Sequence, residues 1–414
     1  MTARTRTSVA AGTVTVGAGL VLLGASATVY LVLSARAAGP REFASVSTLW
    51  TLVYTFGIGA FLPFEQELGR AIAGRTELGE GGAPVVVRTA QAAAVTLAVL
   101  LAAGAILSPV LVDRLFDDRW ALFLALSVAV AAMAGQYVTR GVFSGSGRFG
   151  WYSAQLGVEG GVRIIGCGIL FAIGVHSVAP YAWLLALAPL ASVLVTVPGT
   201  REALRPGPPA PWTEISANLG WLLVATVSAQ GVANAAMVAM ALLAPDSDAA
   251  GQFLAAFVIA RVPLFLFQAV QAVLIPGLAR ALATGDRARF RQESRRVLAA
   301  TGAVAAAGVL GAAALGPQVL RLAFGAEFAL GRLDIVVLAA ATGFYMIAQV
   351  FQSGVVALER HRDNALGWAA ALAVFALACL IPVSALHRVE LALVSSCAVA
   401  ACLLGARLRD GVKS

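Results

Sequence analysis

The sequence predicts an all-α polytopic membrane protein with about twelve transmembrane helices in two six-helix lobes. Three observations support this fold class. First, 60% of the 414 residues are apolar and only 12% are charged, whereas a soluble domain carries roughly 25% charged residues. Second, the apolar residues gather in runs of about 20, the length that a helix needs to cross a bilayer. Third, no segment shows the alternating pattern of a membrane-spanning strand, so the spans are predicted to be helices.

The apolar runs give the predicted spans in order. The stretch from Ser8 to Ser34 follows two arginines and resembles a signal peptide, but a signal peptide has a shorter apolar region of about 7 to 15 residues. We therefore keep it as the first span. The predicted spans are residues 9–34, 43–63, 89–112, 120–142, 152–175 and 178–197, followed by 217–243, 251–276, 297–316, 333–356, 366–385 and 389–406.

A proline-rich linker divides these spans. Residues 206–211 read Pro-Gly-Pro-Pro-Ala-Pro, and proline lacks the backbone N–H that a helix or a paired strand requires. We therefore predict an N-terminal six-helix lobe at residues 1–197, a cytoplasmic linker at 198–214 and a C-terminal six-helix lobe at 215–414.

The distribution of basic residues predicts the orientation in the cell (inner) membrane. Cytoplasmic loops retain Arg and Lys. Both termini and the loops after even-numbered spans carry most of them, among them Arg140, Arg148 and the arginines from Arg280 to Arg296, which predict a basic helix on the anionic leaflet or a topological anchor. The other loops carry only Arg36, Arg41, Arg114, Arg119, Arg321, Arg332 and Arg388. Both termini are therefore predicted to be cytoplasmic, and the net charge of +8 indicates topology rather than nucleic-acid binding.

The sequence predicts no enzyme, no cofactor and no metal centre. Lys413 is the only lysine, so a Walker A phosphate loop, which needs a lysine, is absent. The cysteines lie in apolar runs without metal-ligand spacing, and we interpret them as core residues. The histidines lie in three different loops, and we assign them no chemistry. These residues are Cys167, Cys379, Cys397, Cys402, His176, His361 and His387.

Two motifs lie at the ends of predicted spans. Residues 145–150 match the dinucleotide pattern G-x-G-x-x-G, but that site requires a soluble strand–turn–helix unit. We interpret them as a tight turn between two helices, where glycine supplies backbone freedom. Glu65 and Glu67, followed by Arg70 and Arg75, end the second span, and we expect a solvated helix end there.

Charged residues in the middle of spans are the candidates for a substrate site. Each costs roughly 2.5–3.5 kcal/mol at the bilayer centre unless it faces protein or water. Glu159 and Arg163 share one face of the fifth span; they form either a structural pair or a cavity-lining pair in which Arg163 meets an anionic head group. Arg261 in the eighth span has no partner at helical spacing, and its guanidinium suits a diphosphate. Further cavity candidates, or contacts between helices, are Gln230, Asn234, Gln268 and Gln271.

Three segments distributed over the chain carry a family resemblance. They are residues 62–70 (Leu-Pro-Phe-Glu-Gln-Glu-Leu-Gly-Arg), residues 140–150 (Arg-Gly-Val-Phe-Ser-Gly through Arg-Phe-Gly) and residues 321–328 (Arg-Leu-Ala-Phe-Gly-Ala-Glu-Phe). Together they resemble the polysaccharide-biosynthesis branch of the MOP exporter superfamily, which includes lipid-linked oligosaccharide flippases and MATE drug antiporters. The resemblance implies two MATE-like lobes around a cavity that opens alternately to each side. It also implies that cationic residues, here Arg163 and Arg261, hold the diphosphate of a polyprenyl carrier.

The predicted function is that of a flippase, which moves a polyprenyl-diphosphate-linked saccharide to the outer leaflet by alternating access. The expected partners are this lipid-linked saccharide, the lipid bilayer and polysaccharide-assembly enzymes, without nucleic acid. One alternative is a proton- or sodium-coupled exporter of drugs or metabolites, and another is a non-transporting membrane assembly protein. Glu159 does not clearly match the cation site of MATE antiporters, which favours the flippase.

Overall fold

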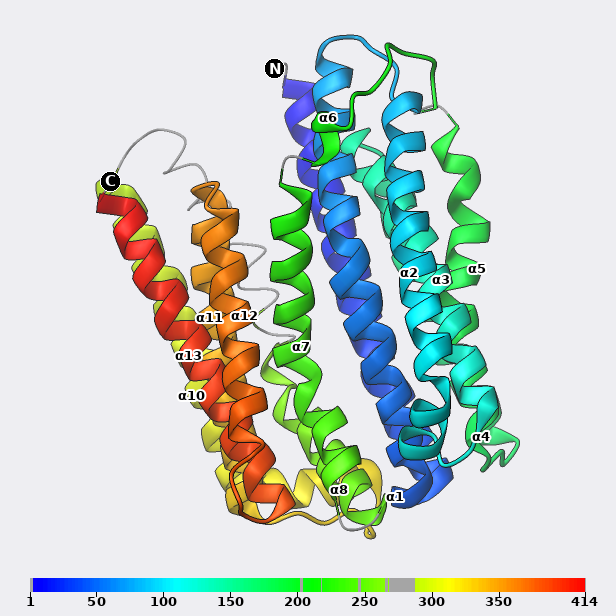
Figure 1. Cartoon of the computed structure of the whole chain (residues 1–414), viewed down its shortest axis with the longest axis vertical. Coiled ribbons are helices and arrows are strands. Elements are labelled where there is room, and N and C mark those ends of the chain that lie inside the picture. Colours follow the sequence, from blue (N-terminus) through cyan, green and yellow to red (C-terminus); the bar gives the residue numbers. More distant parts are fainter. Residues whose placement is uncertain are drawn as a thin grey trace. The chain divides into compact units, whose positions relative to one another are not determined.

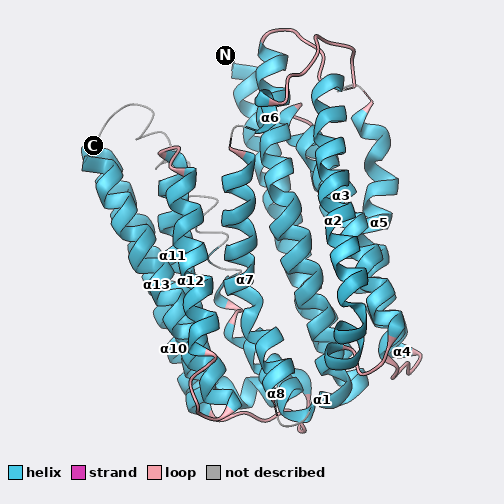
Figure 2. Cartoon of the chain, viewed as in Figure 1, coloured by secondary structure: helices cyan, strands magenta, loops and turns pink. Residues whose placement is uncertain are grey.

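Every regular element in the described part of the computed structural model is a helix (Figures 1 and 2). The structure describes residues 3–201, 204–216, 218–244, 247–264, 267 and 287–413. The elements are α1 (Ala3–Glu77), α2 (Ala83–Leu115), α3 (Trp120–Gly145), α4 (Phe149–Ala172), α5 (Val178–Thr196), the 3-10 helix η1 (Val197–Thr200), α6 (Thr213–Ser216), α7 (Leu219–Leu243), α8 (Ser247–Ala260), α10 (Arg287–Phe324), α11 (Arg332–Ala357), α12 (His361–Ala378) and α13 (Ala385–Lys413). The predicted all-α class is confirmed.

Nine helices of the described chain are long and apolar enough to cross a membrane. One of them, α1, contains both of the first two predicted spans, which are separated at Gly39 by a non-helical backbone with φ 75° and ψ 171°. The predicted eighth span is represented by α8, because most of its later residues lie outside the described chain. The eleventh is α12, which opens on a polar turn from His361 to Asn364. These helices follow the plan of about twelve spans, and the chain is a multi-pass membrane protein.

The predicted end of the eleventh span is wrong. The apolar run predicts an end at residue 385, but α12 ends at Ala378. Residues 379–384 form turns and bends that include Pro382. Proline disfavours helical backbone at the residue before it and removes a helical N–H. The helix therefore ends before the apolar run does.

The chain forms two compact units. Unit 1 comprises Met1–Ala38 and Ser45–Val227, and unit 2 comprises Gly39–Ala44 and Ser228–Ser414. Within unit 1, α3 packs against α2 and α5, and α4 packs against α5; within unit 2, α11 packs against α10 and α13, and α12 packs against α13. The described residues of the linker 198–214 belong to unit 1. Two six-helix lobes joined by this linker stay a prediction.

Helix α2 has an exposed face of aliphatic side chains that is suited to lipid. Along its length it exposes large aliphatic side chains and buries few residues. Water would not tolerate such a continuous apolar face on a soluble monomer, whereas lipid does. The exposed side chains are Val87, Val95, Val99, Ile106, Leu107 and Val110.

The segment that follows the second predicted span differs from the expected solvated helix end. Glu65, Glu67 and Arg75 are all buried. The Arg75 guanidinium forms a two-pronged ion pair with the Glu214 carboxylate, with Nε–Oε1 2.7 Å and Nη2–Oε2 2.8 Å, and Nη1 donates to the Pro208 carbonyl oxygen at 2.8 Å. The prediction was wrong because the linker folds back over Arg75, while Glu65 accepts a hydrogen bond from Tyr152 of α4. The bonds from Arg75 lower the pKa of the Glu214 carboxyl below its ordinary value.

The turn at residues 145–150 confirms the interpretation of its glycine pattern. Helix α3 ends at Gly145 and α4 begins at Phe149. Between them Gly147 has φ 69°, a left-handed conformation that side chains disfavour. A Cβ atom on Gly145 would stand 2.6 Å from the Gly69 carbonyl oxygen. The glycines therefore serve a tight turn and close helix packing.

Candidate functional site

The structure brings the predicted pair of α4 together inside unit 1. Arg163 Nη2 donates to Glu159 Oε1 at 2.6 Å. The two side chains lie one helical turn apart, and their exposed fractions are only 1% and 3%. A pair this deep in an apolar helix depends on further hydrogen bonds to its remaining polar atoms.

Two residues of α3 complete the surroundings of the Glu159 carboxylate. Its Oε2 atom accepts hydrogen bonds from Arg140 Nη2 at 3.0 Å and from Gln136 Nε2 at 2.7 Å. Gln136 also donates to Ser192 Oγ of α5 at 3.0 Å. Glu159 is therefore held by three donors from two helices.

Helix α1 supplies the other partners of Arg163. Its Nη1 donates to Ser26 Oγ at 3.2 Å, and its Nη2 donates to the Tyr54 hydroxyl at 2.6 Å. The guanidinium carbon lies 5.2 Å from the centre of the Trp50 ring, a distance at which a cation is attracted to an aromatic face. Arg163 thus connects both spans of α1 to α4.

Arg140 extends this network towards Glu65. Its guanidinium carbon lies 5.4 Å from the Tyr137 ring centre and 5.9 Å from the Tyr152 ring centre. The Tyr152 hydroxyl donates to Glu65 Oε1 at 2.8 Å. Two arginines and two glutamates therefore balance in charge within the buried network of unit 1. The expected loop position of Arg140 was wrong, because its side chain is buried in α3.

In unit 2 the predicted eighth span is interrupted at Arg261. Helix α8 ends at Ala260. The next two amides bond three residues back, Arg261 N to Val258 O at 3.2 Å and Val262 N to Ile259 O at 3.1 Å. Pro263 follows and disfavours continued α-helix. Arg261 therefore lies at a helix break, a feature that transporters use at binding sites.

The structure connects three predicted residues of unit 2. Arg261 Nη1 donates to Asn234 Oδ1 at 3.3 Å, and Asn234 Nδ2 donates to Gln230 Oε1 at 3.3 Å. The Arg261 guanidinium carbon lies 5.0 Å from the Phe257 ring centre. Within the described chain no carboxylate forms an ion pair with Arg261. The other two predicted residues, Gln268 and Gln271, lie outside the described residues.

A small cavity of about 10 Å³ adjoins Arg261, with Thr342, Tyr345 and Cys397 among its lining residues. This volume holds about one water molecule. Four of the five donors of the guanidinium form no hydrogen bond to the described residues of this unit. Arg261 therefore retains donors, whereas the arginine charges of unit 1 are balanced by Glu159 and Glu65, although Arg163 Nε, Arg140 Nε and Glu65 Oε2 are buried without a hydrogen-bond partner.

The sequence does not indicate the partners that lie on other helices. Arg140, Tyr54 and Ser26 are far from Arg163 in the sequence, and helical spacing carries no information about contacts between helices. One signal in the sequence is the four-residue spacing of Gln136 and Arg140, which is the same as that of Glu159 and Arg163.

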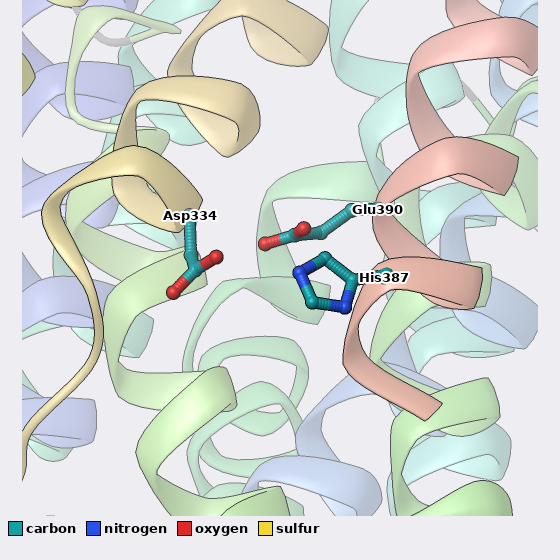
Figure 3. A group of neighbouring side chains, drawn as sticks. All are labelled: Asp334, His387 and Glu390. Atoms are coloured by element: carbon teal, nitrogen blue, oxygen red, sulfur yellow. The ribbon is translucent and has the colours of Figure 1, made fainter. Parts of the chain in front are cut away.

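The sequence also does not indicate a group with metal-binding chemistry in unit 2, which is formed by Asp334, His387 and Glu390 (Figure 3).

No protein-family model matches the chain. An uncharacterised protein of Mycobacterium tuberculosis is 26% identical over 291 residues; the match covers 69% of this chain and spans only 66% of that relative's length. A second uncharacterised protein of the same organism is 27% identical over 402 residues, covering 91% of this chain and 87% of the relative.

Solved structures of MATE transporters are similar over nearly the whole chain. An inward-facing multidrug resistance MATE family transporter of the MOP superfamily gives a TM-score of 0.70 at 14% identity, covering 93% of this chain and 94% of its own. The MATE transporter VcmN of Vibrio cholerae in the bent form gives 0.67 at 16% identity, covering 98% of both chains. An outward-facing MATE family transporter gives 0.66 at 13% identity, covering 97% and 96%. The chain therefore has the MATE transporter fold.

Proposed function

We propose that this protein is a membrane transporter that works by alternating access, and that its substrate is a polyprenyl-diphosphate-linked saccharide moved to the outer leaflet. The fold supports the first part, because similar structures of MATE transporters have been solved in inward-facing and outward-facing conformations. A fold hosts many functions, so the substrate is argued from the residues.

Arg261 carries the substrate proposal. Its guanidinium stands at a helix break without a carboxylate partner in the described chain and donates to a single amide oxygen. A diphosphate offers oxygen atoms in the geometry that a guanidinium binds with parallel hydrogen bonds. An uncharged or cationic drug would leave this positive charge among apolar helices without compensation.

Glu159 argues against a cation-coupled antiporter. A coupling site needs a carboxylate that can exchange its partner for a proton or sodium ion. Glu159 instead accepts bonds from Arg163, Arg140 and Gln136. The antiporter alternative is favoured by the description of one similar structure as a multidrug resistance transporter, and the test below separates the two.

The proposal is tested in vesicles that contain the purified protein and a fluorescent polyprenyl-diphosphate saccharide. The rate of transfer between leaflets is read from quenching of the outer leaflet. We expect Arg261→Ala to reduce the rate at least about tenfold, and Arg261→Lys, which keeps the charge without the planar fork, to lie between Ala and the parent. The control is Arg296→Ala, which removes an exposed arginine of unit 2 paired with Glu293.

Equal transfer by Arg261→Ala and the parent would contradict the role of Arg261. Drug exchange driven by a proton or sodium gradient, without transfer of the lipid, would identify an antiporter. The absence of both activities in inserted, folded protein would indicate a non-transporting assembly protein.

A further inference from the structure

We propose that unit 2 binds a divalent metal ion of the zinc type between the N-terminal ends of α11 and α13. The site consists of Asp334 on α11 and of His387 and Glu390 on α13. One potential ligand atom from each residue lies within 4.8 Å of the other two. Figure 3 shows the carboxylates of Asp334 and Glu390 facing each other, with the His387 ring beside them.

The positions of these residues along α11 and α13 bring their side chains together. His387 and Glu390 are three residues apart in the first two turns of α13, so they lie on one helix face. Asp334 lies in the first turn of α11, and α11 packs against α13. Ligands from two neighbouring helices, including a His and a Glu three residues apart, also build the metal sites of helical bundles.

The environment of Glu390 points independently to a missing cation. Its side chain is only 5% exposed, and its Oε1 atom is buried without a hydrogen-bond partner. Leaving such an oxygen unsatisfied is costly, and a second carboxylate opposite it adds repulsion. Within the described chain no arginine forms an ion pair with either acid. A divalent cation would satisfy both carboxylates.

The nearby arginines are directed elsewhere. Arg388 Nη2 donates to the Val383 carbonyl oxygen at 2.9 Å. Arg332 Nη1 bonds to the carbonyl oxygens of Ala313 and Ala314. Both guanidinium groups therefore bond to backbone carbonyl oxygens, and neither neutralises Asp334 or Glu390.

The ligand chemistry selects the class of ion. One imidazole nitrogen with two carboxylate oxygens suits zinc or a similar first-row ion, whereas magnesium and calcium prefer oxygen ligands alone. Zinc lies about 2.0–2.2 Å from such ligands, which places ligand atoms roughly 3.4 Å apart, so small side-chain rotations close the observed arrangement. Ser384 Oγ lies 2.7 Å from His387 Nδ1, and this bond orients the ring with Nε2 towards the acids (Figure 3). His387 is exposed, so an ion and its completing water have access.

The test uses full-length protein without an affinity tag, purified in detergent with a chelator and then titrated with ZnCl₂. Bound metal is measured by mass spectrometry after gel filtration, and thermal unfolding is recorded in parallel. We expect a single zinc ion per chain and a rise in the unfolding temperature, because a ligand of the folded state stabilises it. His387→Gln and Glu390→Gln should each weaken binding by at least about tenfold. His361→Gln, which changes a histidine of unit 2 outside this group, should bind as the parent does.

Three outcomes would overturn the site. The parent could bind zinc no more tightly than magnesium or calcium. His387→Gln and Glu390→Gln could both bind zinc as tightly as the parent, or His361→Gln could lose as much zinc affinity as they do. If Glu390→Gln does not fold, the exposed His387→Gln decides alone. A parent protein that binds no zinc, together with a Glu390→Gln variant that unfolds at higher temperature, would show that the two acids share a proton instead. None of these outcomes depends on the transported substrate.

Discussion

Unit 1 and unit 2 each place arginine among apolar helices, but they compensate its charge differently. In unit 1, Arg163 and Arg140 share the Glu159 carboxylate, and tyrosine and serine hydroxyls complete the network. In unit 2, Arg261 contacts an amide oxygen and an aromatic ring. A neutralised arginine has little left to offer a ligand, whereas an arginine without a counter-charge retains its donors. The same residue type is therefore expected to support structure in one unit and anion binding in the other.

The largest expected effect is that of Arg163→Ala on stability. Removing one partner of a buried ion pair costs about 3–5 kcal/mol, because the remaining charge is no longer compensated. We expect this loss in the free energy of unfolding, measured by equilibrium denaturation in mixed detergent micelles. The double variant Glu159→Gln with Arg163→Met should recover part of it, because it removes both charges.

Arg296→Ala is the matched control for that measurement, because its ion pair lies at the surface and contributes about 0–1 kcal/mol. If Arg163→Ala were as stable as Arg296→Ala, the network of unit 1 would not be structural. Such a result, combined with lost transport, would make Arg163 a substrate residue like Arg261.

An intermediate effect is expected for Glu214, whose carboxylate pairs with Arg75 beyond the end of the second predicted span. Because Arg75 lowers the pKa of Glu214, the pair stabilises the folded protein fully above the unfolded pKa, near about 4.3. This stabilisation is lost as the pH falls below that value through the folded pKa. Unfolding temperatures measured from pH 7 to pH 3 should therefore fall further for the parent than for Glu214→Gln. Parallel curves would show that the ion pair adds no pH-dependent stability.

A small stability effect is expected for Arg261→Ala. Within the described chain it removes one 3.3 Å hydrogen bond and one contact with an aromatic ring, worth about 1 kcal/mol. The denaturation curve should nearly overlay that of the parent even though lipid transfer is at least about tenfold slower. A loss as large as that of Arg163→Ala would remove the distinction between the two arginines.

The sequence predicted the helical class and the span positions because apolar length and loop charge are local properties. The contact between Glu159 and Arg163 was likewise predictable, since four residues is one turn of a helix. Their partners on α1 and α3 were not, because residues far apart in the sequence meet only after the helices pack. For the same reason, the sequence does not indicate that Asp334 of α11 lies opposite Glu390 of α13.

Burial at the end of α1 was also unpredictable from local pattern. Glu65, Glu67 and Arg75 follow the apolar run as residues of a solvated end do, but Glu214 of α6 pairs with Arg75 and Tyr152 of α4 donates to Glu65. Charge at a helix end therefore indicates where the apolar span stops, not whether the charged side chains reach water. Arg140 is a second example, because the distribution of basic residues assigns it to a loop, whereas its side chain is buried in α3.

The break in α1 at Gly39 bears on how the chain could be divided into fragments. Residues Gly39–Ala44 belong to unit 2 although the helix on either side belongs to unit 1, and Phe43 lies against Phe324 and Phe328. A nick within residues 198–214 would therefore separate neither unit cleanly from the other. Two co-expressed pieces divided there should remain associated through this short exchanged segment, so proteolysis of the linker is a poor way to isolate either unit.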